Sequence, residues 1–329
     1  MIQKIIHKYH KYRDLQTNTE QQIRENKGRQ IRFYNFWKQS YESMYWKRWF
    51  DAHPEILKNS PKVSVGMFSV FGDRLIIDKV ACDVNIFYSA ENLKNNSFNQ
   101  YADFCLANQH IGLSMGFEYF DNERYVRFPN WMDVFFLKKD DIKSVCKTLC
   151  YPNIKEKNRF AACVCSHDNT IGFPLLRENI IQSFSSISKV SCPGKFRHND
   201  DTLLKDFNDD KMEYLKRFYF NICPENSNAM GYVTEKLFHC ISAGCIPIYW
   251  GSYNNPEPDV LNKDAIIFWS SDEQKNKASL KLISDLYESP KLMNDFLSQP
   301  RLLPTAEEYI YNQMDLIEKC VSSLMKRKD

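Results

Sequence analysis

The sequence FYFNICPENSNAMGYVTEKLFHCISAGCIPIYWGS occupies residues 218–252. Its first six residues, Phe218–Cys223, are almost all apolar and predict a β-strand that ends before a proline. Residues 232–243 carry apolar side chains at helical spacing before Gly244, a common residue just past a helix end, and residues 246–250 predict a second strand. A strand, a helix and a strand in that order are typical of a parallel sheet covered by helices.

The same alternation continues on both sides of this stretch. On the N-terminal side, apolar runs predict strands over 31–37, 63–70, 83–89 and 103–108 and a helix over 40–58. On the C-terminal side, the predicted elements are strands over 159–166, 190–192 and 265–269, a helix from Pro174 and a helix over 211–217. The charged segment 139–158 predicts a linker. We therefore expect an α/β chain of four parts: a basic arm (1–30), two sheet domains (31–150 and 151–304) and a C-terminal helix with a basic end (305–329).

Composition and charge exclude several classes of protein. The 329 residues include 44 basic and 41 acidic side chains, and a net charge of +3 argues against a nucleic-acid-binding protein. Hydrophobic residues make up 43% of the chain, enough for substantial cores, so a disordered protein is not expected. No apolar stretch reaches the ~18–20 residues of a membrane span, and no signal peptide is evident. The eleven cysteines include no CxxC pair, which favours reduced thiols and a cytoplasmic location.

The two ends are more basic than the body. Residues 1–30 hold seven Lys or Arg and three acidic residues, and a Lys-Arg-Lys run lies at 326–328. The first residues form either a solvated arm or a basic amphipathic helix lying on an anionic membrane surface. At the other end, Thr305 and Glu308 match a capping box. The helix that follows has a narrow apolar stripe, either for packing on its own chain or for a homodimer seam: Ile310, Met314, Ile317, Val321 and Leu324.

Cations at two strand–helix junctions are candidates for an anion site. Lys236 lies in the first turn of the helix predicted over 232–243, where a cation is unfavourable unless a bound anion, such as a diphosphate, compensates it. Arg177 lies in the same local context, so the two cations are expected to converge on one phosphate group. Two alternatives stay open. Lys236 and Glu235 can be a solvated helix start, and Arg177 can pair with Glu178 or another surface acid.

Other residue patterns carry less information. Glu91 comes just after the strand predicted over 83–89, at the sheet edge where α/β proteins bind ligands. Cys163 and Cys165 are two apart on a predicted strand, so both thiols face one side, most simply toward the core. The seven histidines have no zinc-like spacing with cysteines, and neither a P-loop nor a dinucleotide-binding glycine motif occurs. We therefore predict no metal site.

Several of these segments together resemble the α-1,3-fucosyltransferase family. The resemblance rests on FNICPEN at 220–226, GYVTEK at 231–236 and IPIYWGS at 246–252. Further matches are 166–179 with its Arg-Glu-Asn element at 177–179, FYSAEN at 87–92 and RYVRFP at 124–129. The chain departs from the family pattern at Ala90, which replaces a glycine, and at Pro224, where the family commonly has an aromatic residue. The resemblance extends over most of residues 31–300.

The resemblance implies a GT-B fold, in which two Rossmann-like domains with parallel sheets face a central cleft. It also implies that Arg177 and Lys236 bind the diphosphate of GDP-fucose. In addition, Asn226, Tyr232 and Glu235 are expected to line the donor pocket. No metal ion or other cofactor is expected to be essential.

On the acceptor side, the resemblance implies that Glu91 is the general base, and Glu118 and Arg127 are further candidates there. The implied activity is inverting transfer of L-fucose from GDP-fucose to the 3-hydroxyl of GlcNAc in a lactosamine-type glycan, which gives a Lewis X type product. The alternatives are a GT-B enzyme that uses another sugar nucleotide and a non-catalytic nucleotide- or glycan-binding module. The expected partners are GDP-fucose and an oligosaccharide or lipid-linked glycan, with the basic termini as a peripheral membrane contact.

Overall fold

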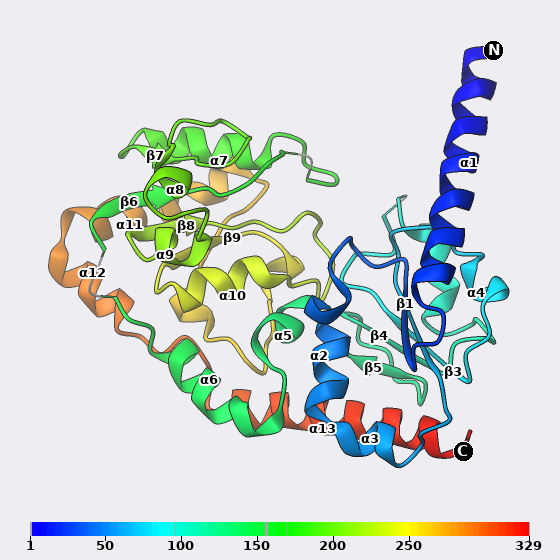
Figure 1. Ribbon diagram of the computed structural model, residues 1–329. Helices are drawn as coiled ribbons and strands as arrows, with labels where there is room; N and C mark the ends of the chain where they lie inside the picture. The colour runs from blue at the N-terminus through cyan, green and yellow to red at the C-terminus, as the bar shows by residue number, and fades with distance from the viewer. Residues whose placement is uncertain (1, 96, 155–156, 169, 329) are drawn as a thin grey trace. The chain divides into compact units, whose positions relative to one another are not determined.

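The computed structural model describes residues 2–95, 97–154, 157–168 and 170–328 (Figure 1). The chain divides into two compact units. Unit 1 comprises residues 1–128, 137–139 and 312–329, and unit 2 comprises residues 129–136 and 140–311. Within the described residues, each unit contains a five-stranded sheet whose neighbouring strands are all parallel. The predicted α/β class with two parallel sheets is therefore confirmed.

The sheet of unit 1 adds its strands in chain order. The strands are β1 (Ile31–Tyr34), β2 (Val65–Phe68), β3 (Val84–Tyr88), β4 (Leu113–Gly116) and β5 (Tyr125–Arg127). Most of their residues are buried, as expected where covering elements pack on both faces of a parallel sheet. The helices and helical turns are α1 (Ile2–Glu25), η1 (Tyr41–Ser43), α2 (Tyr45–Ala52), α3 (Pro54–Lys58), α4 (Ile76–Lys79) and η2 (Asn99–Phe104).

Two predictions for unit 1 were wrong. The fourth strand is not 103–108 but β4, because Tyr101 and Phe104, three residues apart, share one face of the 3₁₀ turn η2 and pack on Phe87 of the sheet. The helix predicted over 40–58 is broken before Pro54. Proline has no amide hydrogen to continue α2, and it instead occupies the first position of α3.

The sheet of unit 2 reverses its direction of growth. Its strands are β6 (Arg159–Ala162), β7 (Val190–Ser191), β8 (Phe218–Ile222), β9 (Ile246–Tyr249) and β10 (Ile267–Phe268), in the order β10-β9-β8-β6-β7. After β6 the chain first adds β7 on one side and then adds β8 on the other. The carboxyl ends of β6 and β8 thus flank a topological switch point, the place where open α/β sheets bind their ligands.

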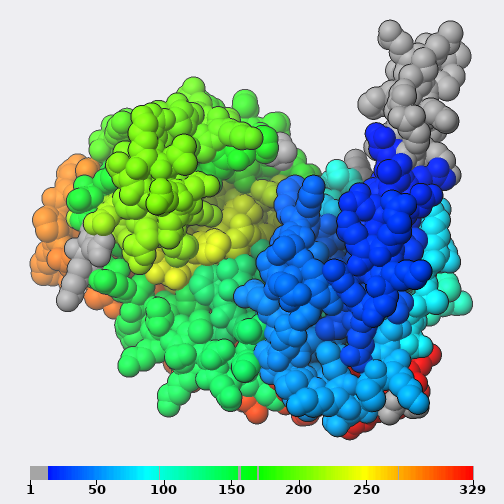
Figure 2. Space-filling view, in the orientation of Figure 1, coloured from blue at the N-terminus to red at the C-terminus, as the bar shows by residue number. Residues whose placement is uncertain are grey.

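The helices of unit 2 include several that the sequence did not predict. They are α5 (Asn130–Phe135), α6 (Ile142–Cys150), α7 (Leu176–Ser185), α8 (Thr202–Lys205), α9 (Lys211–Leu215), α10 (Glu235–Ser242), α11 (Asn276–Glu288) and α12 (Pro290–Leu297), with helical turns η3 (Lys139–Asp141), η4 (Ser252–Asn254), η5 (Lys263–Ala265) and η6 (Glu273–Lys275). The predicted linker 139–158 is wrong over α6, whose Ile142, Cys146 and Leu149 recur at helical spacing and are buried. In the space-filling view, the yellow atoms of the α10 segment lie recessed between those of α9 and α6 (Figure 2).

The C-terminal helix α13 (Ala306–Lys326) uses its apolar stripe within the chain. Ile310, Met314, Ile317 and Val321 are at most 1% exposed, so they are not available as a homodimer seam. The Thr305 hydroxyl donates to the carbonyl oxygen of Asp259, 2.7 Å away. Among the described residues, no helix combines the length and the apolar character that a membrane span needs.

Candidate functional site

Several residues of the predicted donor site lie at the switch point of unit 2. Arg177 is in the first turn of α7, which follows β6. Asn226 follows β8, and Lys236 is in the first turn of α10. These three residues therefore lie in the segments that follow β6 and β8, the two strands whose carboxyl ends flank the crevice.

The Arg177 guanidinium is buried, with the residue 4% exposed. It donates to the carbonyl oxygens of His167 (3.2 Å) and Pro224 (3.2 Å), to Thr170 Oγ1 (3.3 Å) and to Asn226 Oδ1 (3.0 Å). All four acceptors are neutral. Neutral oxygen atoms do not cancel the charge of a buried cation, which favours a bound anion.

The alternative that Arg177 pairs with Glu178 does not hold. Glu178 instead forms an ion pair with Arg197, in which the nitrogen and oxygen are 2.7 Å apart. The carboxylate of Asp168 accepts the backbone amides of Arg177 (3.1 Å) and Glu178 (2.9 Å), so it caps α7. The guanidinium itself donates to the four neutral acceptors named above.

The start of α10 differs from the prediction. The helix begins at Glu235 rather than Tyr232, because Thr234 takes an extended conformation and its hydroxyl caps the amide of Lys236. The amide of Glu235 donates to Asn130 Oδ1 at 3.2 Å. Side chains thus satisfy first-turn amides of α10, as Asp168 does in α7. The positive character of this site rests on side-chain cations more than on open helix amides.

Lys236 is oriented by a buried carboxylate that the sequence did not single out. Glu225 is 0% exposed and accepts from the amide (2.8 Å) and hydroxyl (2.7 Å) of Thr234. The Lys236 ammonium lies 3.4 Å from Glu225 Oε2 and donates to Thr234 Oγ1 at 2.9 Å. Burial lowers the pKa of Lys236, but the carboxylates of Glu225 and Glu235 outweigh it and hold this pKa above its ordinary value. Lys236 therefore remains a cation.

The glycine after β9 makes room for this carboxylate. A Cβ atom at Gly251 would lie 2.8 Å from Glu225 Cγ and 2.9 Å from the Tyr249 hydroxyl. Its φ of +149° is also one that other residues rarely adopt. The IPIYWGS segment is thus needed for the packing of Glu225, which in turn positions Lys236.

A small cavity of about 30 Å³ brings the two predicted cations together and adds a third. Its lining residues are Val164, Cys165, Arg177, Lys211, Asn221, Ile222, Cys223, Pro224 and Lys236. Lys211, the first residue of α9, was missed because it follows Asp209 and Asp210 in a polar loop that resembles a solvated surface. Its position at the junction before β8 was the available signal. Three cations around one cavity create a positive potential that attracts an anion.

The other predicted donor residues, Asn226, Tyr232 and Glu235, are not among those that line this cavity. Tyr232 is 2% exposed, and its amide donates to the carbonyl oxygen of Ala229 at 3.0 Å. Glu235 is partly exposed at the start of α10. Burial raises the pKa of Glu235, but Lys236, Lys211 and His239 lower it by more, so this carboxyl is ionised.

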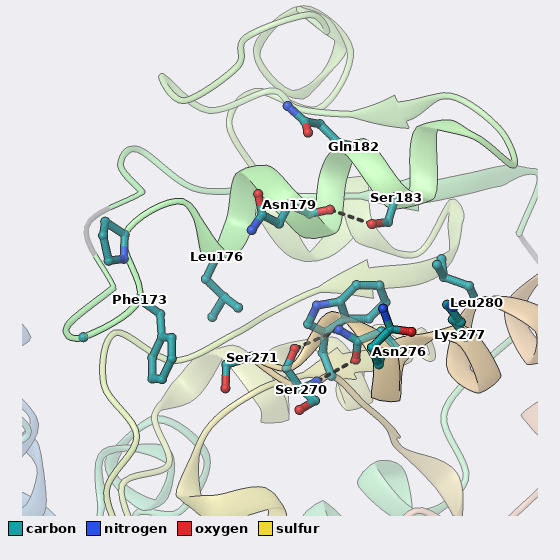
Figure 3. Close-up of a pocket in the computed structure, with 14 residues that line it drawn as sticks. Phe173, Leu176, Asn179, Gln182, Ser183, Ser270, Ser271, Asn276, Lys277 and Leu280 are labelled. Atoms are coloured by element: carbon teal, nitrogen blue, oxygen red, sulfur yellow. Dashed lines mark hydrogen bonds between the residues drawn. The ribbon is translucent and has the colours of Figure 1, made fainter.

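A larger groove of about 560 Å³ lies along α7 (Figure 3). Phe173, Leu176 and Asn179 line one wall, and residues that follow β10 line the other. Asn276 Oδ1 accepts from the backbone amide of Ser270, and Asn276 Nδ2 donates to the carbonyl oxygen of Ser270, each at 2.8 Å. The three cations of the small cavity do not line this groove, which makes it the weaker candidate for an anion.

In unit 1, the carboxyl edge of the sheet carries carboxylates. Glu91 follows β3, and its amide donates to Ser89 Oγ at 3.1 Å while that hydroxyl donates back to the Glu91 carbonyl oxygen at 3.0 Å. This turn fixes the backbone of Glu91, and its side chain is partly exposed. The predicted base therefore has an anchored backbone and access to solvent.

Glu118 and Arg127 lie at the same edge of unit 1. The Tyr125 hydroxyl donates to Glu118 Oε2 at 2.9 Å, and burial raises the pKa of Glu118. Gly116 allows this pair, since a Cβ atom there would lie 2.9 Å from Glu118 Oε2. Arg127 is 7% exposed, donates to the carbonyl oxygen of Phe117 and stacks over the ring of Tyr119 at 4.3 Å. Tyr125 is the partner that the sequence did not reveal.

Among the described residues there is no group of three or more His, Cys, Asp or Glu side chains that could hold a metal ion.

Comparison with known proteins identifies the family. The Alpha-(1,3)-fucosyltransferase FucT N-terminal domain matches residues 31–134, and Glycosyltransferase family 10 (fucosyltransferase) C-term matches residues 154–298. The chain belongs to the family 10 fucosyltransferases. The predicted family is thereby confirmed, with one model for each of the two sheet-containing parts of the chain.

Two relatives of this family 10 chain are less than 30% identical to it. It is 29% identical to the Alpha-(1,3)-fucosyltransferase FucT of Helicobacter pylori over 196 residues, which are 51% of this chain and 37% of that protein. It is 27% identical to Alpha-(1,3)-fucosyltransferase B of Drosophila melanogaster over 128 residues, 36% of this chain and 28% of that protein. The matched region thus spans about a third of the length of these relatives.

Solved structures of an α1,3-fucosyltransferase share the fold. The structure with GDP-fucose is 20% identical, covers 88% of this chain and 89% of that chain, and has a TM-score of 0.56. The structure without a named ligand has a TM-score of 0.57 at 19% identity. At this identity the likeness establishes the fold alone.

Proposed function

We propose that this family 10 chain is an inverting α-1,3-fucosyltransferase. It transfers L-fucose from GDP-fucose to the 3-hydroxyl of GlcNAc in a lactosamine-type glycan and gives a Lewis X type product. The observation that carries the proposal is that Arg177, Lys211 and Lys236 line one cavity at the switch point of a unit that matches the fucosyltransferase family. Relatives named α-1,3-fucosyltransferase and a related structure with GDP-fucose support it.

In the donor site, Arg177 and Lys236 bind the diphosphate, and Lys211 adds a third positive charge. Asn226 holds the guanidinium of Arg177, and Glu225 holds the ammonium of Lys236. As the bond to fucose breaks, negative charge grows on the departing GDP. Cations fixed in place before the reaction stabilise that charge without reorganisation. Tyr232 and Glu235 complete the donor pocket around the sugar and ribose.

On the acceptor side, Glu91 is the general base. It removes the proton of the acceptor 3-hydroxyl while that oxygen bonds to the anomeric carbon of fucose, and GDP leaves from the opposite face. One displacement of this kind inverts the anomeric configuration. Glu118 and Arg127 contribute to acceptor binding, with Tyr125 holding Glu118 in place.

The decisive experiment is a linkage assay. The purified chain is incubated with GDP-fucose and lactosamine, lacto-N-biose, lactose or chitobiose, and the linkage formed is determined. We expect α-1,3-fucosyl lactosamine as the main product. Calorimetry with GDP, UDP and GDP-fucose separates the alternatives: a preference for UDP contradicts the donor assignment, and GDP-fucose binding without turnover on any acceptor indicates a binding module.

We further propose that the protein acts in the cytoplasm on lipid-linked glycans and touches the membrane through its basic ends. Lysine- and arginine-rich segments are attracted to anionic lipid surfaces, by about 1 kcal/mol per basic residue near the surface. Co-sedimentation with anionic vesicles tests this. Binding that is unaffected by removal of residues 1–30 excludes the N-terminal segment as the contact.

A further inference from the structure

Two cysteines lie just past the carboxyl end of β6, beside the cation cavity. The sulfur atoms of Cys163 and Cys165 are 3.6 Å apart. Cys163 is 1% exposed, whereas Cys165 is partly exposed and lines the cavity together with Arg177 and Lys236. One thiol is thus accessible from the proposed donor site, and the other lies directly behind it.

The backbone around this pair is fixed on both sides. The amide of Cys163 donates to the carbonyl oxygen of Ser191 at 2.9 Å, and the carbonyl oxygen of Cys165 accepts from the amide of Phe196 at 3.2 Å. Gly194 packs so closely that a Cβ atom there would lie 2.1 Å from the Cys165 carbonyl oxygen. The two thiols are therefore held as neighbours, with their sulfur atoms 3.6 Å apart.

The two thiols differ in acidity. The hydrogen bond from Cys163 lowers the pKa of Cys165, and the positive charge of Arg177 acts in the same direction. The same hydrogen bond and complete burial raise the pKa of Cys163. A partly exposed cysteine with a lowered pKa and a second thiol behind it is the arrangement found in redox-sensitive cysteine pairs.

We propose that Cys165 is an oxidative modification site that closes a disulfide with Cys163 and thereby weakens donor binding. This inference rests on the proposed donor site. The oxidant is a peroxide. The Cys165 thiolate attacks one oxygen of hydrogen peroxide, so that a sulfur–oxygen bond forms, the oxygen–oxygen bond breaks and hydroxide leaves. The sulfur is oxidised to a sulfenic acid while the peroxide is reduced.

The second step consumes the Cys163 thiol. Its sulfur attacks the sulfenic sulfur of Cys165, a sulfur–sulfur bond forms, and the hydroxyl group leaves as water with the thiol proton. Because a disulfide bond is ~2.05 Å long, the sulfur atoms must approach from 3.6 Å. This movement displaces a side chain that lines the cavity together with Arg177 and Lys236. We expect a severalfold rise in the Michaelis constant for GDP-fucose.

The experiment uses the full chain. The reduced protein is treated with hydrogen peroxide and digested without a reducing agent. The mass of the peptide that contains both cysteines is then measured by mass spectrometry. We expect a peptide lighter by two hydrogen atoms and the loss of two free thiols, with the Michaelis constant for GDP-fucose raised and then restored by dithiothreitol. A disulfide that leaves donor binding unchanged overturns the regulatory part. Oxidation that stops at sulfinic acid on Cys165, or that begins at another cysteine, overturns the whole proposal.

Matched variants identify the partner thiol. Cys192 is buried at the end of β7 and is the control, so C192S is expected to form the same disulfide as the unaltered chain. In C163S, Cys165 is expected to reach the sulfenic acid without closing a disulfide. Closure in C163S, or its loss in C192S, contradicts the assignment. If C163S does not fold, the peptide masses of the unaltered chain decide alone. Failure of the reduced protein to bind GDP-fucose refutes the donor site instead, and the peptide masses still report on the disulfide.

Discussion

The two sheets have the same number and direction of strands within the described residues, yet the predicted base at one carboxyl edge and the cavity cations at the other carry opposite charges. In unit 1, strands are added in chain order, and the edge presents Glu91 and Glu118. In unit 2, strand order reverses between β6 and β8, and the edge presents Arg177, Lys211 and Lys236. One scaffold therefore presents two kinds of charged group, and the loops that follow the strands determine which kind.

The difference also extends to how the charges are held. In unit 1, Glu118 accepts a hydrogen bond from the Tyr125 hydroxyl, and burial raises the pKa of Glu118. In unit 2, Arg177 is buried among neutral oxygen atoms, while Lys236 is tied to the buried Glu225. A carboxylate edge suits proton removal and a cation edge suits an anionic leaving group. Substitutions at each edge should therefore have different kinetic signatures.

The largest effect is expected at the carboxylate edge. In Glu91→Ala the acceptor hydroxyl loses its base, and turnover should fall by roughly 10²–10⁴-fold, the usual contribution of general base catalysis. The affinity for GDP-fucose should stay unchanged because this residue belongs to the other edge. Initial-rate kinetics together with calorimetric titration of GDP-fucose measure both quantities.

Glu123→Ala is the matched control for this loss, since Glu123 is an exposed carboxylate between β4 and β5 of the same unit. It should keep normal turnover. Wild-type turnover in Glu91→Ala, or an equal loss in the Glu123 variant, would remove the distinction between the two edges.

The next effect is expected at the cation edge. Arg177→Lys keeps the charge but cannot maintain contacts to both Asn226 and Pro224, because an ammonium lacks the planar fork of a guanidinium. A hydrogen bond to a charged group is worth about 1.5–3 kcal/mol, so the dissociation constant for GDP should rise roughly 10- to 100-fold. The exposed Arg197→Lys serves as control, and equal GDP affinity in both variants would contradict the donor assignment.

A smaller effect is expected for Lys211→Ala. Lys211 lines the cavity and contributes positive charge to it. We expect a severalfold rise in the dissociation constant for GDP that shrinks at high salt, since screening weakens such an interaction. The exposed Lys205→Ala, from a residue paired with Asp201, should leave GDP affinity unchanged at every salt concentration.

These experiments also mark how far the sequence alone predicts the molecule. The apolar runs located β1, β2, β3, β6 and β8, because strands buried on both faces have few polar residues. The same criterion misplaced a strand over 103–108, where the burial of Phe104 comes from a 3₁₀ turn. It also missed α6, whose charged surface resembled a linker.

At the site, the sequence predicted the two cations at strand–helix junctions but not the residues that hold them. Arg177 and Lys236 stood out because a cation is unfavourable in the first turn of a helix. Glu225 and Lys211 did not, because their importance depends on long-range contacts that no local pattern encodes. Glu225 accepts the amide of Thr234 and lies 3.4 Å from the Lys236 ammonium, and a lysine after two aspartates is usually a surface residue.

A further prediction tests whether the amino edge of unit 2 serves stability alone. Asp200 accepts hydrogen bonds from Thr202, Tyr214 and Arg159, the first residue of β6. Burial opposes ionisation, but these bonds hold the pKa of Asp200 well below its usual range. Asp200→Asn should lower the free energy of unfolding by about 1.5–3 kcal/mol at neutral pH.

The pH dependence of this loss follows from the lowered pKa. The ionised carboxylate stabilises the folded state above the unfolded pKa of about 3.9, and that stabilisation disappears as the pH falls through the folded value. Denaturant titrations of the variant and the unaltered chain should therefore differ at pH 7 and converge in strong acid. The Michaelis constant for GDP-fucose should not change. A large change would mean that the two edges of this sheet are not independent.

Metal removal is expected to have no effect. The proposed role of Arg177, Lys211 and Lys236 is to stabilise the charge that develops on departing GDP, which is the role a divalent cation takes in many nucleotide-sugar enzymes. If three side-chain cations suffice, EDTA should leave the turnover number and the Michaelis constant for GDP-fucose unchanged, and added Mg²⁺ or Mn²⁺ should not raise the rate. Loss of turnover in EDTA that only a divalent cation restores would mean that the cation edge orients the donor while a metal ion neutralises the leaving group. The contrast between the two sheets would then be one of positioning rather than of charge stabilisation.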